Sequence, residues 1–318
     1  MAVGAWSDAI PVTGTIDGKT GSGTMRVYLP AGCSSERRCP LVLALHGWGD
    51  SAEGWMAKGD LAAFADQYGL VIAVPSMGKT IYETRFYPES RGKWTTAPGA
   101  RWVGEVILPY LRAHFPVWPD RAHTAVFGYS TGGRGAVLLA EAYPQFAFAG
   151  SVSGTYDLLT LQPAEGEYQI HEAVYGSRAA FQPRWELDNV VAPDRLAKLG
   201  DTRLFISHGA KDAVVKPDQL ESLRRALKAT AVQAELVTVP GAGHDWKFWT
   251  SQWPRLFELA AQSLGALPAL EPARRLPPCP APGAIDAQGV CRPVPCGGIP
   301  GGCGEKPPRP QPGEGGSR

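Results

Sequence analysis

Short apolar runs alternate with longer stretches of helical spacing along most of this chain. The runs are strand-length, and several are rich in β-branched residues, as expected for buried parallel strands. The predicted strands are Val12–Ile16, Thr24–Leu29, Leu41–Leu45, Val71–Val74, Thr124–Phe127, Ala149–Val152, Leu204–Ser207 and Glu235–Val239. The predicted helices are Leu61–Tyr68, Val103–His114, Gly133–Tyr143, Pro217–Thr230 and Trp249–Leu264. The alternation predicts an α/β fold, with a mostly parallel central sheet and helices on both faces.

The first two predicted strands form a hairpin in this interpretation, joined by the turn-rich segment Gly18–Gly23. The later strands run parallel, so their carboxyl ends meet at one edge of the sheet. Ligands of such sheets bind at that edge. Functional residues are therefore expected in the segments that directly follow strands.

Two segments interrupt the alternation. Tyr156–Lys198 has scattered aromatic residues, three prolines and no clean periodicity; it is either part of a substrate pocket over the strand ends or a surface loop with short helices of its own. After Leu264 the chain is crowded with proline and glycine and cannot bury enough surface to offset its ordering entropy. We expect one large domain over residues 1–265, an insertion at about 156–198, and a poorly ordered tail over 266–318.

Composition and charge exclude several classes of protein. The 318 residues are 44% hydrophobic, and 31 Lys and Arg almost balance 30 Asp and Glu, so no net field attracts nucleic acid or an anionic membrane. The longest apolar runs are far shorter than the roughly 20 residues that span a bilayer. We expect neither a nucleic-acid partner nor a membrane span.

Six cysteines lie outside the predicted core: Cys33 and Cys39 flank a short polar loop, and the other four are in the tail, at Cys279, Cys291, Cys296 and Cys303. An even number in such places indicates disulfides formed in an oxidising compartment. Free thiols are the alternative, whereas zinc is disfavoured because the tail has no Cys-x-x-Cys pair and no histidine. Although residues 1–10 do not resemble a signal peptide, we expect a secreted or periplasmic protein whose leader is not part of this sequence.

The candidate chemistry centres on Gly128-Tyr129-Ser130-Thr131-Gly132, which lies between a predicted strand and a predicted helix. A nucleophile elbow needs a tight strand-to-helix turn, and glycines two residues either side of the serine leave room for it. The alternative is an ordinary glycine-rich turn with an exposed serine. The context favours Ser130 as a nucleophile.

A serine hydroxyl needs a base within hydrogen-bonding reach. Of six histidines, His244 follows the last predicted strand and opens the last helix, the place and chain order expected for the base of such an elbow. Asp212, in the loop after Leu204–Ser207, is the predicted acid that orients His244. Asp218 is the nearest rival, but beside Pro217 it is better interpreted as a helix-start residue.

A serine nucleophile of this kind also needs donors for an oxyanion. We predict the backbone N–H of Thr131, directly after the nucleophile, and that of Trp48, in the His46-Gly47-Trp48-Gly49 segment after a strand. No metal or organic cofactor is implied by these residues.

These motifs together resemble the putative-esterase family of α/β-hydrolases. The resemblance rests on Leu45-His46-Gly47, the elbow with Gly133, His208-Gly209-Ala210-Lys211-Asp212, and Gly243-His244-Asp245-Trp246 with Trp249. That family includes S-formylglutathione hydrolase (esterase D), feruloyl esterases, enterochelin esterase and mycolyltransferases. The likeness covers about residues 24–264, and it implies an α/β-hydrolase fold, a Ser130–Asp212–His244 triad, and oxyanion donors at Trp48 and Thr131. Tyr129 is a departure, since many members carry Leu or Met there.

The expected activity is therefore hydrolysis of a carboxylic ester, small or polymer-linked, through an acyl-enzyme. Ten tryptophans, several in predicted loops, could line a pocket for an aromatic acyl group or could anchor the loops. Tyr129, Trp185 and Trp246 are the candidate substrate contacts. Acyl transfer, thioester hydrolysis and a non-catalytic glycan- or wall-binding role are the alternatives.

Overall fold

A computed structural model describes residues 3–91, 97–266, 283–285 and 291–293 of the chain. The chain divides into two units, Met1–Ala269 and Leu270–Arg318. Of the tryptophans and cysteines considered above, Trp94, Cys279, Cys296 and Cys303 lie outside the described residues. In the second unit, β10 (Gly283–Ile285) pairs with β11 (Cys291–Pro293) in antiparallel fashion.

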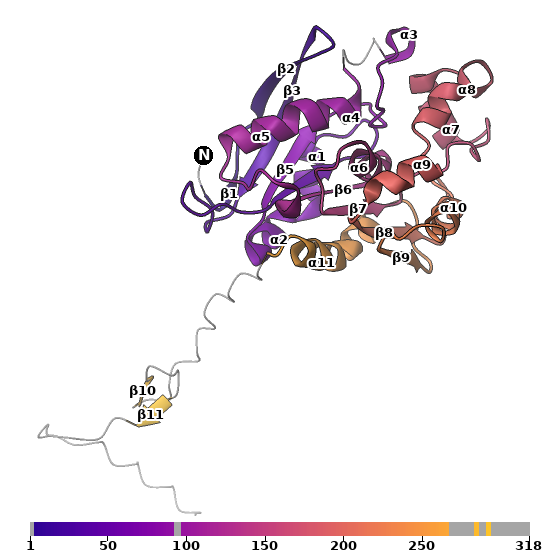
Figure 1. The fold of residues 1–318 in the computed structure, drawn as a ribbon. Coiled ribbons are helices and arrows are strands. Elements are labelled where there is room, and N and C mark those ends of the chain that lie inside the picture. Colours follow the sequence, from indigo (N-terminus) through magenta and orange to yellow (C-terminus); the bar gives the residue numbers. More distant parts are fainter. Residues whose placement is uncertain (1–2, 92–96, 267–282, 286–290, 294–318) are drawn as a thin grey trace, which may run out of the picture. The chain divides into compact units, whose positions relative to one another are not determined.

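A nine-stranded mixed sheet organises the first unit (Figure 1). Its strands are β1 (Ala5–Trp6), β2 (Ile10–Ile16), β3 (Lys19–Leu29), β4 (Leu41–Leu45), β5 (Val71–Ser76), β6 (Thr124–Tyr129), β7 (Phe148–Val152), β8 (Arg203–Gly209) and β9 (Ala234–Val239). Strands β4 to β9 are parallel in the order β5-β4-β6-β7-β8-β9, and β1, β2 and β3 are antiparallel at the other edge. The predicted mostly parallel sheet is confirmed, and β4 begins and ends at the predicted residues.

The predicted turn between the first two strands was wrong. Residues 19–23 belong to β3 and pair with β2, and only Asp17 and Gly18 turn the chain. Both have positive φ, 50° and 75°, which is the geometry of a two-residue hairpin turn. Because these two residues supply the whole reversal, the glycines at 21 and 23 are free to pair within the ladder.

Helices cover both faces of the sheet (Figure 1). Successive residues of a strand point to opposite faces and so pack against different helices. Along β4, Leu41, Leu43 and Leu45 belong to one buried cluster and Val42 and Ala44 to the other. On the face of the leucines lie α4 (Gly99–Arg101), a π-helical turn (Trp102–Ile107), α5 (Leu108–His114), α6 (Thr131–Ala142) and α10 (Asp218–Leu227). On the other lie α1 (Ala52–Gly59), α2 (Leu61–Tyr68) and α11 (Trp246–Ser263).

The insertion, predicted at 156–198, forms helices of its own. They are α7 (Gly166–Tyr175), α8 (Arg178–Leu187) and α9 (Pro193–Leu196), the last continued by a 3₁₀ turn over Ala197–Leu199. A separate apolar cluster in this region is formed by Leu158, Leu161, Tyr168, Val174, Tyr175 and Trp185 with Ile81. Two further short helices lie outside it, α3 (Pro88–Arg91) and a 3₁₀ turn at Arg121–His123.

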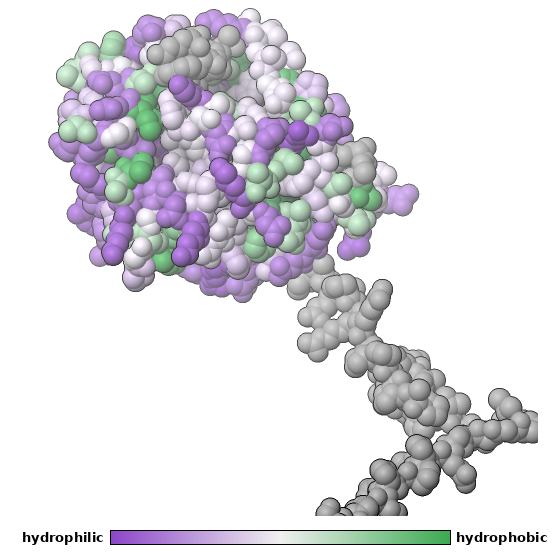
Figure 2. Space-filling view, turned by 180° about the vertical axis from the view of Figure 1, so that it is seen from behind, coloured by the Kyte–Doolittle hydropathy of each residue, from purple (hydrophilic) through white to green (hydrophobic). Residues whose placement is uncertain are grey.

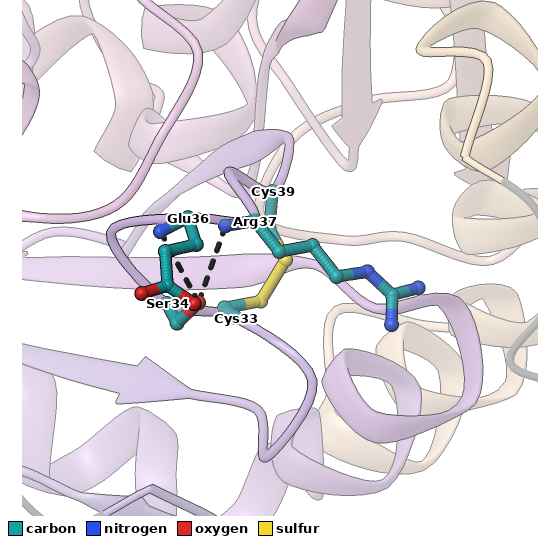
Figure 3. Close-up of a disulfide and its surroundings, with 5 residues drawn as sticks. All are labelled: Cys33, Ser34, Glu36, Arg37 and Cys39. Atoms are coloured by element: carbon teal, nitrogen blue, oxygen red, sulfur yellow. Dashed lines mark hydrogen bonds between the residues drawn. A yellow bond between two sulfur atoms is a disulfide. The ribbon is translucent and has the colours of Figure 1, made fainter.

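Cys33 and Cys39 form a disulfide across the loop between β3 and β4 (Figure 3). Within that loop the Ser34 hydroxyl accepts the main-chain N–H groups of Glu36 and Arg37. Figure 2 shows one face of the first unit, where hydrophilic residues dominate and hydrophobic ones are scattered. Among the described residues, no helix is long and apolar enough to cross a membrane.

Candidate active site

Ser130 lies at a sharp turn between β6 and α6. Its φ of 55° and ψ of −127° place a non-glycine residue in the positive-φ region, which is a strained backbone geometry. The turn is held because the Ser130 N–H donates to Val152 O at 2.9 Å and the Arg134 N–H donates to Ser130 O at 3.1 Å. This geometry presents the serine side chain at the carboxyl end of the central strand.

The flanking glycines are required by close backbone contacts. A Cβ added to Gly132 would lie 2.0 Å from Leu45 O, and one added to Gly128 would lie 2.4 Å from Gly132 C. Both distances are shorter than any real contact allows, so no larger residue can occupy these positions without moving β4 or α6. The Gly-x-Ser-x-Gly spacing therefore reflects the packing of the turn against strand β4.

Three polar side chains that are far apart in the sequence meet beside this turn. The Ser130 hydroxyl lies 3.0 Å from His244 Nε2, and His244 Nδ1 lies 2.8 Å from Asp212 Oδ2. Asp212 follows β8, and His244 lies between β9 and α11. With Nδ1–H donating to the carboxylate, Nε2 is left to accept the serine proton, which is the arrangement that general-base activation needs.

Asp212 is buried, and main-chain N–H groups donate hydrogen bonds to its carboxylate. Its Oδ1 accepts the main-chain N–H groups of Val214 at 3.0 Å and Val215 at 2.9 Å. Burial by itself raises the pKa of Asp212, but the hydrogen bond and charge of His244, together with the Val215 N–H, lower the pKa below its usual value. The carboxylate therefore stays ionised and holds the imidazole in one orientation.

The other candidate acid and base residues have different roles. Asp218 is exposed in the first turn of α10. His208 is buried in β8, where its Nε2–H donates to Val215 O at 2.9 Å, and burial lowers its pKa. His208 thus braces the loop that carries Asp212.

His46 contributes its side chain as well as its backbone, although at this strand end the backbone surroundings were expected to matter more than the imidazole. Its ring is fully buried, Nδ1–H donates to Gly47 O at 2.7 Å, and Nε2 accepts the Met77 N–H at 2.7 Å. The imidazole therefore ties the segment after β4 to the end of β5. The Tyr82 hydroxyl also donates to His46 O at 3.0 Å.

The segment that contains Trp48 lies against the serine turn. A Cβ added to Gly47 would lie 3.2 Å from Ser130 Cβ and 2.8 Å from the Tyr129 ring. Thr131 is the first residue of α6, so its N–H belongs to the helix N-terminus beside the serine. The structure thus brings both predicted oxyanion segments to the turn at Ser130.

The three predicted substrate contacts differ in exposure. Tyr129 is 3% exposed and Trp185 is fully buried, with its Nε1–H donating to Gly176 O at 3.0 Å. Trp185 packs within the insertion against Tyr168, at 4.9 Å between ring centroids. Trp246, at the start of α11, is partly exposed. Direct contact of a substrate with Trp185 would require its displacement from this cluster.

A buried arginine that the sequence analysis missed connects the insertion to α6, the helix that follows Ser130. Arg134 of α6 is 0% exposed and donates to Ile81 O at 2.6 Å, to the Tyr175 hydroxyl at 3.0 Å and to Asp188 O at 2.8 Å. The Asp188 carboxylate accepts the Tyr175 O–H at 2.9 Å and the N–H and hydroxyl of Thr84. A second connection joins Glu141 of α6 to Arg195 of α9 at 2.9 Å.

Among the described residues, no group of three or more His, Cys, Asp or Glu side chains is arranged to hold a metal ion.

This sheet order, strained serine turn and order Ser–Asp–His along the chain define the α/β-hydrolase class. The family model described as "Putative esterase" matches residues 20–257. The chain belongs to this family, and the family assigns it to the carboxylic ester hydrolases.

Named relatives are similar at low identity. An endo-1,4-β-xylanase/feruloyl esterase of Xylanibacter ruminicola is 24% identical over 253 residues, which are 76% of this chain and 29% of that protein. An acetyl esterase of Caldicellulosiruptor saccharolyticus is 22% identical over 224 residues, 67% of this chain and 80% of that one. The match thus spans less than a third of the xylanase/feruloyl esterase and most of the acetyl esterase.

Solved structures of other proteins share this fold. The S-formylglutathione hydrolase of Staphylococcus aureus superposes with a TM-score of 0.63 at 18% identity, covering 81% of this chain and 99% of that one. At this identity the likeness concerns the fold.

Proposed function

We propose that this protein is a serine esterase that hydrolyses carboxylic esters through an acyl-enzyme on Ser130. The observation that carries the proposal is the continuous hydrogen-bonded series Ser130–His244–Asp212, with distances of 3.0 and 2.8 Å, at a strained turn. A serine hydroxyl is a weak nucleophile at neutral pH, and this series supplies the base that it needs.

The reaction has two halves. His244 Nε2 takes the Ser130 proton as Oγ bonds to the ester carbonyl carbon, and the carbonyl oxygen becomes an oxyanion. The oxyanion collapses, the bond to the alcohol oxygen breaks, and His244 gives its proton to the leaving alcohol. Water then attacks the acyl carbon while His244 takes its proton; the bond to Ser130 Oγ breaks to release the acid, and His244 returns the proton to Oγ.

The main-chain N–H groups of Trp48 and Thr131 are proposed to bind the oxyanion. The position of Gly47 against Ser130 and the place of Thr131 at the start of α6 support this role. Removal of one such donor in comparable enzymes lowers the rate about 10²–10³-fold.

We propose aromatic acyl esters of the feruloyl type, or acetyl esters, as substrates. The names of the feruloyl and acetyl esterase relatives support these two classes. Trp246, partly exposed on the helix that follows His244, is the proposed aromatic contact. We also propose that residues 1–265 form the catalytic domain and that the protein acts outside the cytoplasm, which the Cys33–Cys39 disulfide supports.

The test compares purified wild type with Ser130→Ala on p-nitrophenyl acetate, methyl ferulate, an aromatic polyester oligomer, acetylated xylan and S-formylglutathione. We expect hydrolysis of an oxygen ester by wild type, loss of that activity in Ser130→Ala, and labelling of Ser130 alone by a fluorophosphonate. Preference for S-formylglutathione would make the protein a thioesterase, and ester formation with an added alcohol would make it an acyltransferase. Activity that persists in Ser130→Ala would refute the proposal.

A further inference from the structure

Tyr129, the residue before the proposed nucleophile, makes a long-range hydrogen bond that the sequence did not reveal. Its hydroxyl donates to Asp50 Oδ2 at 2.5 Å, and the two residues are 79 positions apart in the chain. Burial, and then the hydrogen bond to Asp50, raise the pKa of Tyr129, so the phenol keeps its proton and remains a donor. The bond joins the end of strand β6 to the segment after strand β4.

The Tyr129 ring has little freedom to move. It stacks on Trp249 at 4.4 Å between centroids and lies 4.7 Å from each of Trp55 and Trp246. These indoles belong to α1 and α11, on one face of the sheet. Because its ring is packed on several sides, the hydroxyl is held at a fixed point.

Asp50 is also held in place by hydrogen bonds. It lies at the far end of residues 47–50, which we call the oxyanion loop. Its N–H donates to Gly47 O at 3.2 Å, and its Oδ1 accepts the Ser51 N–H at 2.8 Å. Gly47, at the near end of the loop, packs directly against the Tyr129 ring. Tyr129 therefore contacts the oxyanion loop on both sides of Trp48.

Two more hydrogen bonds at this loop lead to a different part of the sheet. His46 is bonded to Met77, and the Gly49 N–H donates to Gly78 O at 3.0 Å, so both attach the loop to the end of β5. The bond from Tyr129 attaches it to β6, the strand that presents Ser130. Stabilisation of an oxyanion depends on donors held within tenths of an ångström of the reacting atoms.

We propose that Tyr129 is a positioning residue, which through its hydrogen bond to Asp50 fixes the distance between the Trp48 N–H and Ser130. This inference rests on the proposed esterase function. It assigns Tyr129 a role in the rate of the chemical step and not in substrate binding, because its ring is buried beneath the site.

The experiment measures kcat and KM for p-nitrophenyl acetate in Tyr129→Phe, Asp50→Ala, Asp50→Asn and the double variant Tyr129→Phe/Asp50→Ala. We expect Tyr129→Phe to lower kcat about tenfold with KM within about twofold, because the Trp48 N–H that this bond positions acts only as the oxyanion forms. Asp50→Ala should match it, and the double variant should be no worse than either single variant. Asp50→Asn should stay within about threefold of wild type, since its amide can bond both Ser51 N–H and the Tyr129 hydroxyl.

Tyr28→Phe is the matched control. Tyr28 is 4% exposed, and its hydroxyl donates to Asp66 Oδ2 at 2.7 Å, so it is also a buried tyrosine that donates to an aspartate, away from the site. We expect this variant to keep wild-type kcat. An equal loss of kcat in Tyr28→Phe would overturn the inference, as would an Asp50→Asn variant as slow as Asp50→Ala.

Ser130→Ala in the same series separates the two proposals. An inactive Ser130→Ala beside a Tyr129→Phe with wild-type kcat would overturn the positioning role and leave the esterase proposal intact. An active Ser130→Ala would overturn both. Melting temperatures of all variants, measured alongside, show whether each change in kcat occurs in a folded protein.

Discussion

Arg134 lies one helical turn after Ser130 and donates a hydrogen bond of 2.8 Å to the main-chain oxygen of Asp188, 54 residues further along the chain. Asp188 ends helix α8 of the insertion. The same guanidinium reaches Tyr175 at the end of α7, so two helices of the insertion are bonded to the helix of the nucleophile. The insertion is thus a fixed part of the domain and not a lid that opens freely.

We predict that Arg134→Met destabilises the protein by about 3–5 kcal/mol, because it leaves several buried acceptors without a partner. Urea unfolding would measure the change. Arg225→Met removes an exposed arginine of α10 and should change the free energy of unfolding by less than about 0.5 kcal/mol. A loss below about 1 kcal/mol in Arg134→Met would show that the network does not hold the insertion.

We predict that Asp212→Asn lowers kcat about 10³–10⁴-fold, since an amide favours the wrong tautomer of His244. Asp218→Asn is the matched control, because it changes the same residue type six positions later, on the exposed start of α10. Its kcat should stay within about twofold of wild type. Steady-state hydrolysis of p-nitrophenyl acetate measures both variants, and the reverse ranking would identify Asp218 as the acid.

His171 should make the protein sensitive to acid. Burial, and then the charge of Arg134, lower the pKa of His171 to about 3, while its Nδ1–H donates to Glu167 O at 2.8 Å. The unfolded chain, with an ordinary histidine pKa of about 6.5, binds the proton more readily, so stability is lost as pH falls below that value.

The predicted size of this effect is about 1.4 kcal/mol per pH unit between pH 6 and 4. His171→Gln removes the titrating group and should flatten the pH dependence of the free energy of unfolding in this window. His114→Gln, at an exposed position, should keep the wild-type slope. Equal slopes for wild type and His171→Gln would contradict the prediction.

The Cys33–Cys39 disulfide should stabilise the fold without contributing to catalysis. Closing so short a loop stabilises by about 2 kcal/mol, so the double variant Cys33→Ser/Cys39→Ser should lose that amount in urea unfolding. The loop precedes the amino end of β4, opposite the edge that carries Ser130, so kcat should not change. Ser34→Ala keeps the disulfide and loses two N–H bonds in the same loop; an equal loss there would exclude the disulfide as the cause.

The mostly parallel sheet and the turn at Ser130 could be predicted because their signals are local. Buried parallel strands are short continuous apolar runs, and the glycines at 128 and 132 are imposed by contacts of the turn itself. The structure brings Asp212 and His244 beside Ser130, and their catalytic roles stay predictions. Asp218 was set aside because it stands beside Pro217 as a helix-start residue, and it does lie in the first turn of α10. Family membership and the α/β-hydrolase fold, both expected from these motifs, are confirmed.

The features that the sequence did not reveal depend on partners far along the chain. Arg134, between glycines, gives no sign of burial, since its acceptors are 41 to 54 residues away. Tyr129 looked like a wall of the substrate pocket because the position of Asp50 was unknown. Helix α1 was missed because Gly54 and Gly59 are poor helix formers; burial of Trp55 and capping by Ser51 stabilise it.

The positive φ of Ser130 also bears on how this chain can evolve. Glycine adopts that geometry freely, whereas serine holds it at an expense of about 1–3 kcal/mol of folding free energy. Glycine at position 130 would therefore be more stable than serine, but it would lack the hydroxyl. Selection for stability alone would favour glycine over serine at this turn.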